Sequence, residues 1–299
     1  MDLAHSPEWA FFFERDIMQS IPVLDSTIAY RELGERGSHA VIFLHGNPTH
    51  SFIWRDIMPH VAGKAWCLAP DLIGFGASGK PDIEYTFLEH AAYLEAFLQK
   101  MEVEQFTLVG QDWGGALAIH LAARYPAKVR GVALMEFVRP SPTWEDFHPL
   151  AQARERFKLM RGPGTGEDFV LKQNAFIEQM LPKGSLRPLT PEEMDAYRAP
   201  FPTAESRKPM LAFPRMMPIA GEPADVYQLI ERNEAIMATA QYPKLILFSP
   251  NGVLTPRAVA ERYAAEFANC QLVELGEGTH NVQEDHPDTI GRAIAAWLP

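Results

Sequence analysis

The sequence predicts an α/β fold: a mostly parallel, doubly wound sheet with a helical cap inserted into it. Uninterrupted apolar runs at 40–44, 131–135 and 244–248 are typical of strands buried on both faces of a parallel sheet. Segments with helical spacing alternate with these runs, as expected for a sheet covered by helices on both sides. A length of 299 residues suits one such domain carrying a sizeable insertion better than two equal domains.

The insertion is indicated by a change of composition between 140 and 241. Prolines there separate short helix-like pieces such as 144–160 and 167–180. We therefore expect a helical cap domain at 140–241 and a main domain formed by 1–139 together with 242–299.

The remaining elements follow in order along the chain. We expect an opening hairpin at 21–33 with its turn at Asp25 and Ser26, helices at 51–61, 86–99, 256–267 and 287–298, strands at 65–69 and 271–275, and a glycine-punctuated loop at 71–81. The helix at 86–99 is expected to turn Leu88, Ala92, Leu94 and Leu98 inward.

Charge and composition narrow the classes of partner. The chain has 27 basic and 38 acidic residues, a net charge of −11, and no basic cluster, which argues against DNA, RNA or an anionic membrane as a partner. The first 19 residues show no secretory signal, and no stretch is long enough to span a bilayer. Cys67 and Cys270 are expected to be buried thiols. We expect a cytoplasmic protein that acts on an uncharged small molecule.

One sharp turn organises the predicted site. An apolar run ends at Gly110, Asp112 follows, and Gly114 opens a helix-like segment. The two glycines allow strand and helix to pack closely around a residue in a strained conformation. This is the nucleophile-elbow pattern with Asp in place of the usual Ser. A carboxylate is ionised at neutral pH and attacks without a base. The alternative, a simple helix N-cap, does not require the flanking glycines.

Three further polar residues fall at strand ends on the same face: Asn47, Glu136 and His280. His280 is the candidate general base, oriented by Glu136 as in other catalytic triads. The alternatives are a solvated loop histidine and a Glu136 that pairs only with Arg139. The loop at 249–256, the more common place for the acid, has no carboxylate, which favours Glu136. We expect no metal site, because no His or Cys cluster has ligand spacing.

Two residues are candidate hydrogen-bond donors to a leaving anion. Asn47 carries a backbone N–H and a side-chain amide, and Trp113 carries an indole N–H directly after the nucleophile. The plainer readings are a turn residue before Pro48 and core packing, respectively.

From about residue 40 to the C-terminus the sequence resembles the haloalkane dehalogenases of the α/β-hydrolase superfamily. The resemblance rests on the motifs at 45–49, 71–76, 111–114, 135–140, 173–178 and 280–285. It implies Asp112 as nucleophile, His280 as base, Glu136 as catalytic acid, and Asn47 with Trp113 as the halide-stabilising pair. Gln111 departs from the His that is usual before the nucleophile, and we expect this change to alter local packing.

The expected reaction has two steps and needs no cofactor. Asp112 displaces halide to form an alkyl ester, and water activated by His280 then hydrolyses the ester. The partners would be a halogenated hydrocarbon, water and a halide ion, and the chain would be a monomer or small homo-oligomer. By resemblance, the pocket would be lined by Phe147, Leu150, Phe176, Phe213, Met217, Val253, Leu254 and Asn281. Ordinary core packing is the alternative for each of them.

Three other functions remain open at this point. An epoxide hydrolase also uses an Asp on this elbow, but by resemblance it needs cap tyrosines, for which Tyr197 and Tyr227 are the candidates. Coelenterazine-type luciferases share much of the constellation. A non-catalytic ligand-binding relative is the third possibility.

Overall fold

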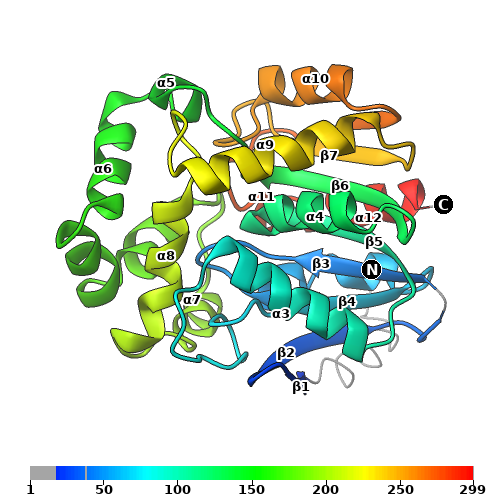
Figure 1. Cartoon of the computed structure of the whole chain (residues 1–299), viewed down its shortest axis with the longest axis horizontal. Coiled ribbons are helices and arrows are strands. Elements are labelled where there is room, and N and C mark those ends of the chain that lie inside the picture. The colour runs from blue at the N-terminus through cyan, green and yellow to red at the C-terminus, as the bar shows by residue number, and fades with distance from the viewer. Residues whose placement is uncertain (1–17, 38, 299) are drawn as a thin grey trace, which may run out of the picture.

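A computed structural model describes residues 18–37 and 39–298 of the chain (Figure 1). The expectation that the first 19 residues hold no secretory signal lies, for residues 1–17, outside the described residues. No helix in the described ranges is both long and apolar enough to cross a lipid bilayer.

Eight strands form a single sheet in the order β1-β2-β4-β3-β5-β6-β7-β8. Their bounds are β1 Gln19–Val23, β2 Ser26–Leu33, β3 His39–Leu44, β4 Trp66–Pro70, β5 Gln105–Asp112, β6 Val129–Phe137, β7 Lys244–Phe248 and β8 Cys270–Glu274. The pairs β1/β2 and β2/β4 are antiparallel, and all later pairs are parallel. The predicted α/β-hydrolase fold with its mostly parallel sheet is therefore confirmed.

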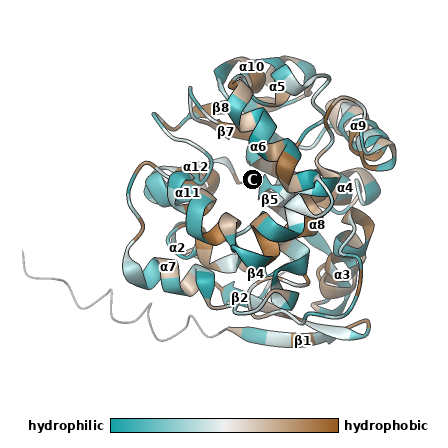
Figure 2. Ribbon diagram, turned by 90° about the vertical axis from the view of Figure 1, so that its left-hand side faces the viewer, coloured by the Kyte–Doolittle hydropathy of each residue, from teal (hydrophilic) through white to brown (hydrophobic). Residues whose placement is uncertain are grey.

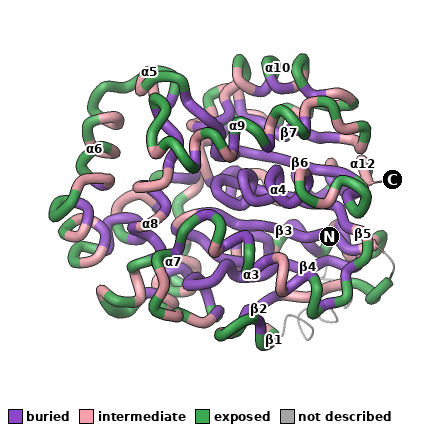
Figure 3. The backbone as a smooth tube through the Cα atoms, viewed as in Figure 1, coloured by how far each residue is buried: buried purple, intermediate pink, exposed green. Residues whose placement is uncertain are grey.

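The central strands have the composition that burial on both faces requires. Ile42 of β3 lies opposite Leu108 of β5, which lies opposite Val132 of β6, and none of the three is appreciably exposed. Figure 3 shows β3, β5 and β6 buried along most of their length. Because helices cover both sides, the apolar runs do not need to alternate with polar residues.

Helices flank the sheet on its two faces. In the main domain they are α2 Met58–Val61, α3 Phe87–Lys100, α4 Trp113–Arg124, α9 Ala224–Thr239, α10 Arg257–Glu266, α11 Val282–Asp285 and α12 Pro287–Trp297. In Figure 1, α3, α4 and α9 lie side by side in front of the sheet. The helices α2 and α12 also pack against each other. The helix expected at 51–61 is broken into a 3₁₀ turn, Ser51–Trp54, and α2.

The inward face of α3 differs from the expectation for two residues. Leu94 and Leu98 are buried as expected, but Leu88 is 57% exposed and Ala92 is also exposed. Phe87 and Ala91 take their places in the core. Residues 87, 91, 94 and 98 follow the spacing of a single helix face, so the expected stripe was displaced by one residue at its N-terminal half.

Short helical pieces between β6 and β7 gather at the carboxyl ends of the parallel strands (Figure 1). They are α5 Trp144–Phe147, α6 Ala151–Arg161, the π-helical Glu167–Lys172 and Phe176–Met180, η5 Leu181–Lys183, α7 Pro191–Arg198, η6 Glu205–Arg207 and α8 Lys208–Met216. We call this group the cap. Figure 2, which looks onto the cap, shows that α6 and α8 carry both apolar and polar residues. Such mixed helices are typical of a layer with one covered face.

The last helix of the expected 140–241 insertion, α9, packs on a helix of the sheet layer. α9 packs against α4, and the Asn233 side chain lies 3.0 Å from His120 Nδ1 in that contact. The exact boundaries of the cap domain remain a prediction.

Both cysteines are free thiols. Cys67 is buried in β4, and burial raises its pKa to about 12. Cys270, expected to be buried, is only partly buried because it begins the edge strand β8.

Candidate active site

The nucleophile turn is built from close backbone contacts. Asp112 ends β5 with a φ of 53° and a ψ of −126°, and α4 begins at the next residue. A Cβ on Gly46 would overlap the Asp112 carboxylate, and one on Gly114 would overlap the backbone of Leu44. Side chains at these positions would push the β3 loop away from the nucleophile. The sharp turn expected at Asp112 is confirmed.

The two oxygens of Asp112 have different surroundings. Oδ2 accepts a hydrogen bond from the backbone N–H of Asn47 at 2.8 Å, while Oδ1 lies 3.8 Å from His280 Nε2. Burial raises the pKa of Asp112, and His280 together with the backbone N–H groups of Asn47 and Trp113 offsets part of that effect. One oxygen is thus anchored and the other is free to react.

Glu136 lies one residue before the end of β6, on the Nδ1 side of the His280 ring. Its Oε2 lies 3.3 Å from His280 Nδ1 and also accepts the backbone N–H groups of Val253 and Leu254 at 2.9 and 2.8 Å. Oε1 accepts the N–H of Thr255 at 3.0 Å. The loop after β7, which has no carboxylate, therefore supplies the backbone donors that hold one.

The alternative role of Glu136 as partner of Arg139 finds no support in this geometry. Arg139 directs its guanidinium to the backbone carbonyls of Pro140, Asp146 and Leu254. No ion pair joins the two side chains in the part of the chain that the structure describes.

Opposing effects act on the pKa of His280. Burial lowers its pKa, but the hydrogen bond to Glu136 and the charges of Asp112 and Glu136 outweigh burial, so the net shift of the pKa is upward. Loss of the Asp112 charge would remove one of the causes that raise it.

Gln111 touches the same ring. Its Nε2 lies 3.2 Å from His280 Nε2 and 3.2 Å from the His280 carbonyl oxygen. Because a carbonyl oxygen only accepts, the amide group facing it must be the NH₂, and its second hydrogen points to His280 Nε2. This arrangement suits a neutral ring with its lone pair on Nε2 and its proton on Nδ1, facing Glu136. Gln111 thus does more than adjust local packing, the only effect that the sequence suggested.

The candidate anion donors are Asn47 and Trp113. Trp113 borders the cavity, and its indole N–H forms no hydrogen bond with the described residues. The Asn47 amide nitrogen donates to the carbonyl of Met210 at 3.2 Å, and its second hydrogen has no protein acceptor in the described ranges. Both groups can donate to a ligand beside Asp112.

A cavity of about 290 Å³ opens onto these groups. It is bordered by Asp112, Trp113 and His280 on the sheet side and by cap residues on the other. Of the expected lining, Phe147, Phe176, Met217, Val253, Leu254 and Asn281 border it.

Two expected lining residues lie elsewhere. Leu150 is 65% exposed at the start of α6, because its position before the first helical turn points it to solvent. Phe213 is fully buried one layer further back, where its ring stacks on Trp113 at 4.8 Å. Phe213 therefore fixes the indole rather than bordering the cavity.

The cap tyrosines considered for epoxide chemistry do not border the cavity. Tyr197 is fully buried and donates to Glu284 at 2.5 Å, and Tyr227 lies on α9 outside the lining. No tyrosine of the described residues lines this cavity. No group of three or more potential metal-binding side chains lies within 18–37 and 39–298.

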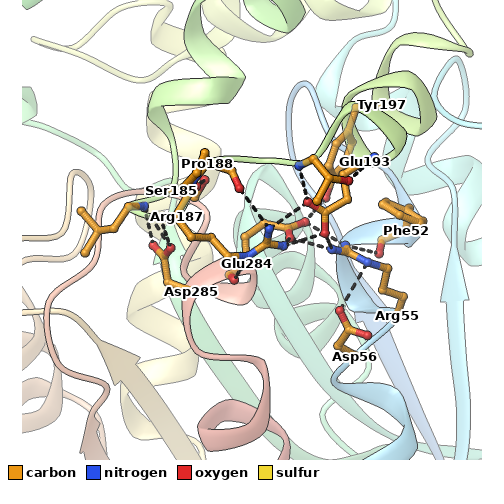
Figure 4. A network of polar contacts seen from close by, with 12 residues as sticks. Phe52, Arg55, Asp56, Ser185, Arg187, Pro188, Glu193, Tyr197, Glu284 and Asp285 are labelled. Atoms are coloured by element: carbon orange, nitrogen blue, oxygen red, sulfur yellow. Dashed lines mark hydrogen bonds and ion pairs between the residues drawn. The ribbon is translucent and has the colours of Figure 1, made fainter.

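The sequence analysis did not predict a network of ion pairs that joins the cap to the segment following His280 (Figure 4). Glu284, four residues after His280, accepts hydrogen bonds from both Nη atoms of Arg55 at 2.8 and 2.7 Å. Arg187 of the cap also pairs with Glu284, and Glu193 joins Arg55 and Arg187 at 2.6 and 2.8 Å. Glu284 and Asp285 belong to the 280–285 motif, but nothing in the sequence identifies Arg55 or Arg187 as their partners.

Breaking this network should destabilise the fold. Glu284→Gln would leave Arg55 and Arg187 without their shared carboxylate, a change that typically costs about 3–5 kcal/mol for buried pairs. Urea unfolding should show this loss of free energy, whereas Lys172→Gln, which breaks an exposed, solvent-screened pair with Asp168, should leave the free energy of unfolding nearly unchanged. Equal effects of the two substitutions would show that the network is not a structural tie.

Comparison with known proteins agrees with this geometry. Residues 39–287 match the family model described as alpha/beta hydrolase fold. The chain is 54% identical over 279 residues to a haloalkane dehalogenase of Mesorhizobium japonicum, covering 93% of this chain and 90% of that protein. It is also 54% identical to a haloalkane dehalogenase of Bradyrhizobium diazoefficiens, covering 93% and 92%. The solved structure of the haloalkane dehalogenase DbeA from Bradyrhizobium elkani USDA94 has a TM-score of 0.93 at 52% identity, covering 94% of this chain and 97% of that one. The chain therefore belongs to the haloalkane dehalogenases, hydrolases with the alpha/beta hydrolase fold.

Proposed function

We propose that this protein hydrolyses the carbon–halogen bond of haloalkanes to an alcohol, a halide ion and a proton, through an alkyl ester on Asp112. The observation that carries the proposal is one arrangement: the Asp112 carboxylate with a free oxygen, the His280 ring backed by Glu136, and the indole of Trp113 come together at one mostly apolar cavity, which Asp112, Trp113 and His280 border. A nucleophile, a base and an anion donor are the three groups that this chemistry requires.

In the first step, Oδ1 of Asp112 attacks the halogen-bearing carbon while the halide departs. Oδ1 is the better candidate because Oδ2 is held by the backbone N–H of Asn47. The departing anion accepts hydrogen bonds from the indole of Trp113 and the free amide hydrogen of Asn47.

In the second step, His280 takes a proton from water, which attacks the ester carbon. Oδ2 becomes the oxyanion and keeps its hydrogen bond from the backbone N–H of Asn47, while the backbone N–H of Trp113 also stabilises the negative charge of this carboxyl group. Glu136 stabilises the imidazolium through Nδ1. Esterification removes the negative charge of Asp112, so the pKa of His280 falls when the ring must act as a base.

The two rival activities are separated by simple assays. Epoxide hydrolysis is disfavoured by the absence of a tyrosine from the described lining of the cavity. Coelenterazine-dependent light emission uses a similar constellation and is tested directly by luminescence. Halide release from short and medium bromo-, iodo- and chloroalkanes, measured beside both assays, identifies the activity. Halide preference and chain length depend on the shape of the cavity and its mouth.

His280→Phe should separate the two steps. The variant should release about one halide per active site and then stop, because the base is needed only for hydrolysis of the ester. Intact-mass spectrometry should find the alkyl group on Asp112. The matched control, Asp112→Asn, should release no halide at first turnover. If His280→Phe also releases none despite a normal fold, the covalent route is wrong.

Trp113→Phe should test the anion donor. Removing one preorganised donor of this kind usually costs about 2.7–4 kcal/mol in the transition state, so turnover should fall about 10²- to 10³-fold. Chloride or bromide should also change the tryptophan fluorescence of the parent in a saturable way, and the variant should lose that response. A loss below about tenfold would assign Trp113 to packing.

Gln111→Leu should shift the pH profile of turnover. The Gln111 N–H stabilises the neutral form of His280, so its loss should raise the pKa of His280. Because the base works only when neutral, the acid limb of turnover should move to higher pH, with the first-turnover release of halide retained.

The matched control is Gln283→Leu, the same exchange at a buried amide whose atoms have no partner among the described residues. It should leave the acid limb in place. An unchanged acid limb in Gln111→Leu would show that Gln111 does not select the state of the ring.

A further inference from the structure

The cap side of the cavity carries positive charge, opposite to the balance of the chain. Arg156 of α6 and Lys183 of η5 both border the cavity, with the polar Gln179 between them in the sequence. Asp112, at the sheet side, is the only acidic residue among the described lining. In a chain of net charge −11, two cavity-lining cations with no ion pair among the described residues are a local exception.

Arg156 has unused hydrogen-bonding capacity. Its Nη2 donates to Gln179 Oε1 at 2.6 Å, and the guanidinium lies 5.3 Å from the centre of the Phe169 ring. Its Nε is buried and has no acceptor within the described part of the chain. Protein atoms cover this Nε, so the group that remains for a ligand in the cavity is Nη1, which forms no hydrogen bond with the described residues.

Its basic neighbours on the same helix are already paired. Arg154 lies 3.3 Å from Glu145, and Lys158 lies 2.7 Å from Glu155. Arg156 faces the cavity instead and has no ion pair with any described residue. Gln179 occupies only Nη2, so Nη1 is left without an acceptor among the described residues and can donate to an anion in the cavity.

Lys183 places a second cation at the water-accessible edge of the cavity. Its side chain is exposed and forms no hydrogen bond or ion pair with the residues that the structure describes. An anion that lies between Arg156 and Lys183 would keep contact with solvent, so it would avoid most of the cost of burying a charge.

We propose that the cavity accepts haloalkanes whose far end carries a carboxylate, with the halogen at Trp113 and the carboxylate at Arg156 and Lys183. The assignment rests on the dehalogenation proposed above and names the substrate class of that site. Charge also sets the direction of binding, because the carboxylate is repelled by Asp112 and attracted by the two cations. The chemical step is unchanged: the products are a hydroxycarboxylate, a halide ion and a proton.

The test compares three substrates of matched length: a 1-bromoalkane, an ω-bromoalkanol and an ω-bromocarboxylate. Arg156→Gln should lower kcat/KM for the bromocarboxylate about ten- to hundredfold, the usual effect of losing a hydrogen bond to a charged group. The same substitution should leave kcat/KM for the bromoalkane nearly unchanged. Lys183→Gln should act in the same direction but less strongly, because its charge is solvated. Added salt should reduce the advantage of the bromocarboxylate.

Controls separate charge from packing. Arg156→Lys should retain part of the preference for the bromocarboxylate. Lys158→Gln removes a cation on the same helix but outside the cavity, and it should change kcat/KM for none of the three substrates. Equal losses for bromoalkane and bromocarboxylate in Arg156→Gln would assign Arg156 to packing and overturn the proposal. So would a parent that hydrolyses the bromoalkane and ignores the bromocarboxylate.

A binding measurement keeps the test independent of turnover. An alkyl carboxylate without halogen should quench the tryptophan fluorescence of the parent, and Arg156→Gln should weaken that binding about ten- to hundredfold. If no halogenated substrate is turned over, the proposed dehalogenation fails, and the binding experiment still decides whether the carboxylate site exists. Absence of carboxylate binding by the parent would overturn the site.

Discussion

The site depends on the close approach of two backbone segments, the turn at Asp112 and the loop after β3. Asp112 occupies a left-handed conformation that costs about 1–3 kcal/mol for a residue with a side chain. The missing side chain at Gly46 lets the Asn47 N–H reach Oδ2, and that contact anchors one carboxylate oxygen. The position of the Asp112 carboxylate is therefore set before a substrate enters, and the His280 ring, the Trp113 indole and the cavity all lie beside it.

A second constraint is the placement of charge behind the nucleophile. Glu136 is buried, yet three backbone N–H groups of residues 253–255 and the His280 ring satisfy its oxygens. Buried carboxylates are tolerated when hydrogen bonds replace their lost water. Strand β6 thus supplies the Glu136 carboxylate, and the loop after the neighbouring strand β7 supplies the N–H groups that bind it.

The sequence was sufficient for the strands and for the residues at their ends, and the family resemblance is confirmed. Uninterrupted apolar runs identify buried parallel strands, and chain order places Asn47, Asp112, Glu136 and His280 at one edge. Periodicity alone could not decide whether Phe87 or Leu88 begins the buried face of α3, because apolar residues occur on both. Nor could it place Leu150 and Phe213, since the proline-broken cap has no regular period from which side-chain direction follows. The partners of Glu284 are distant in sequence and become neighbours only on folding.

The cap is also joined to the loop that carries His280 through the backbone around Gly184. The carbonyl of Gly184 accepts the backbone N–H groups of His280 and Asn281 at 3.1 and 2.5 Å and the hydroxyl of Thr279 at 2.6 Å. Just beyond it, the backbone N–H groups of Leu186 and Arg187 both donate to Asp285 at 2.9–3.0 Å. The segment 184–187 and the loop that carries His280 are therefore held as one body. Lys183 borders the cavity from the residue immediately before this segment. A displacement of the cap at this point would move the base as well as the mouth of the cavity, so the geometry of substrate entry and that of ester hydrolysis are mechanically linked in this fold.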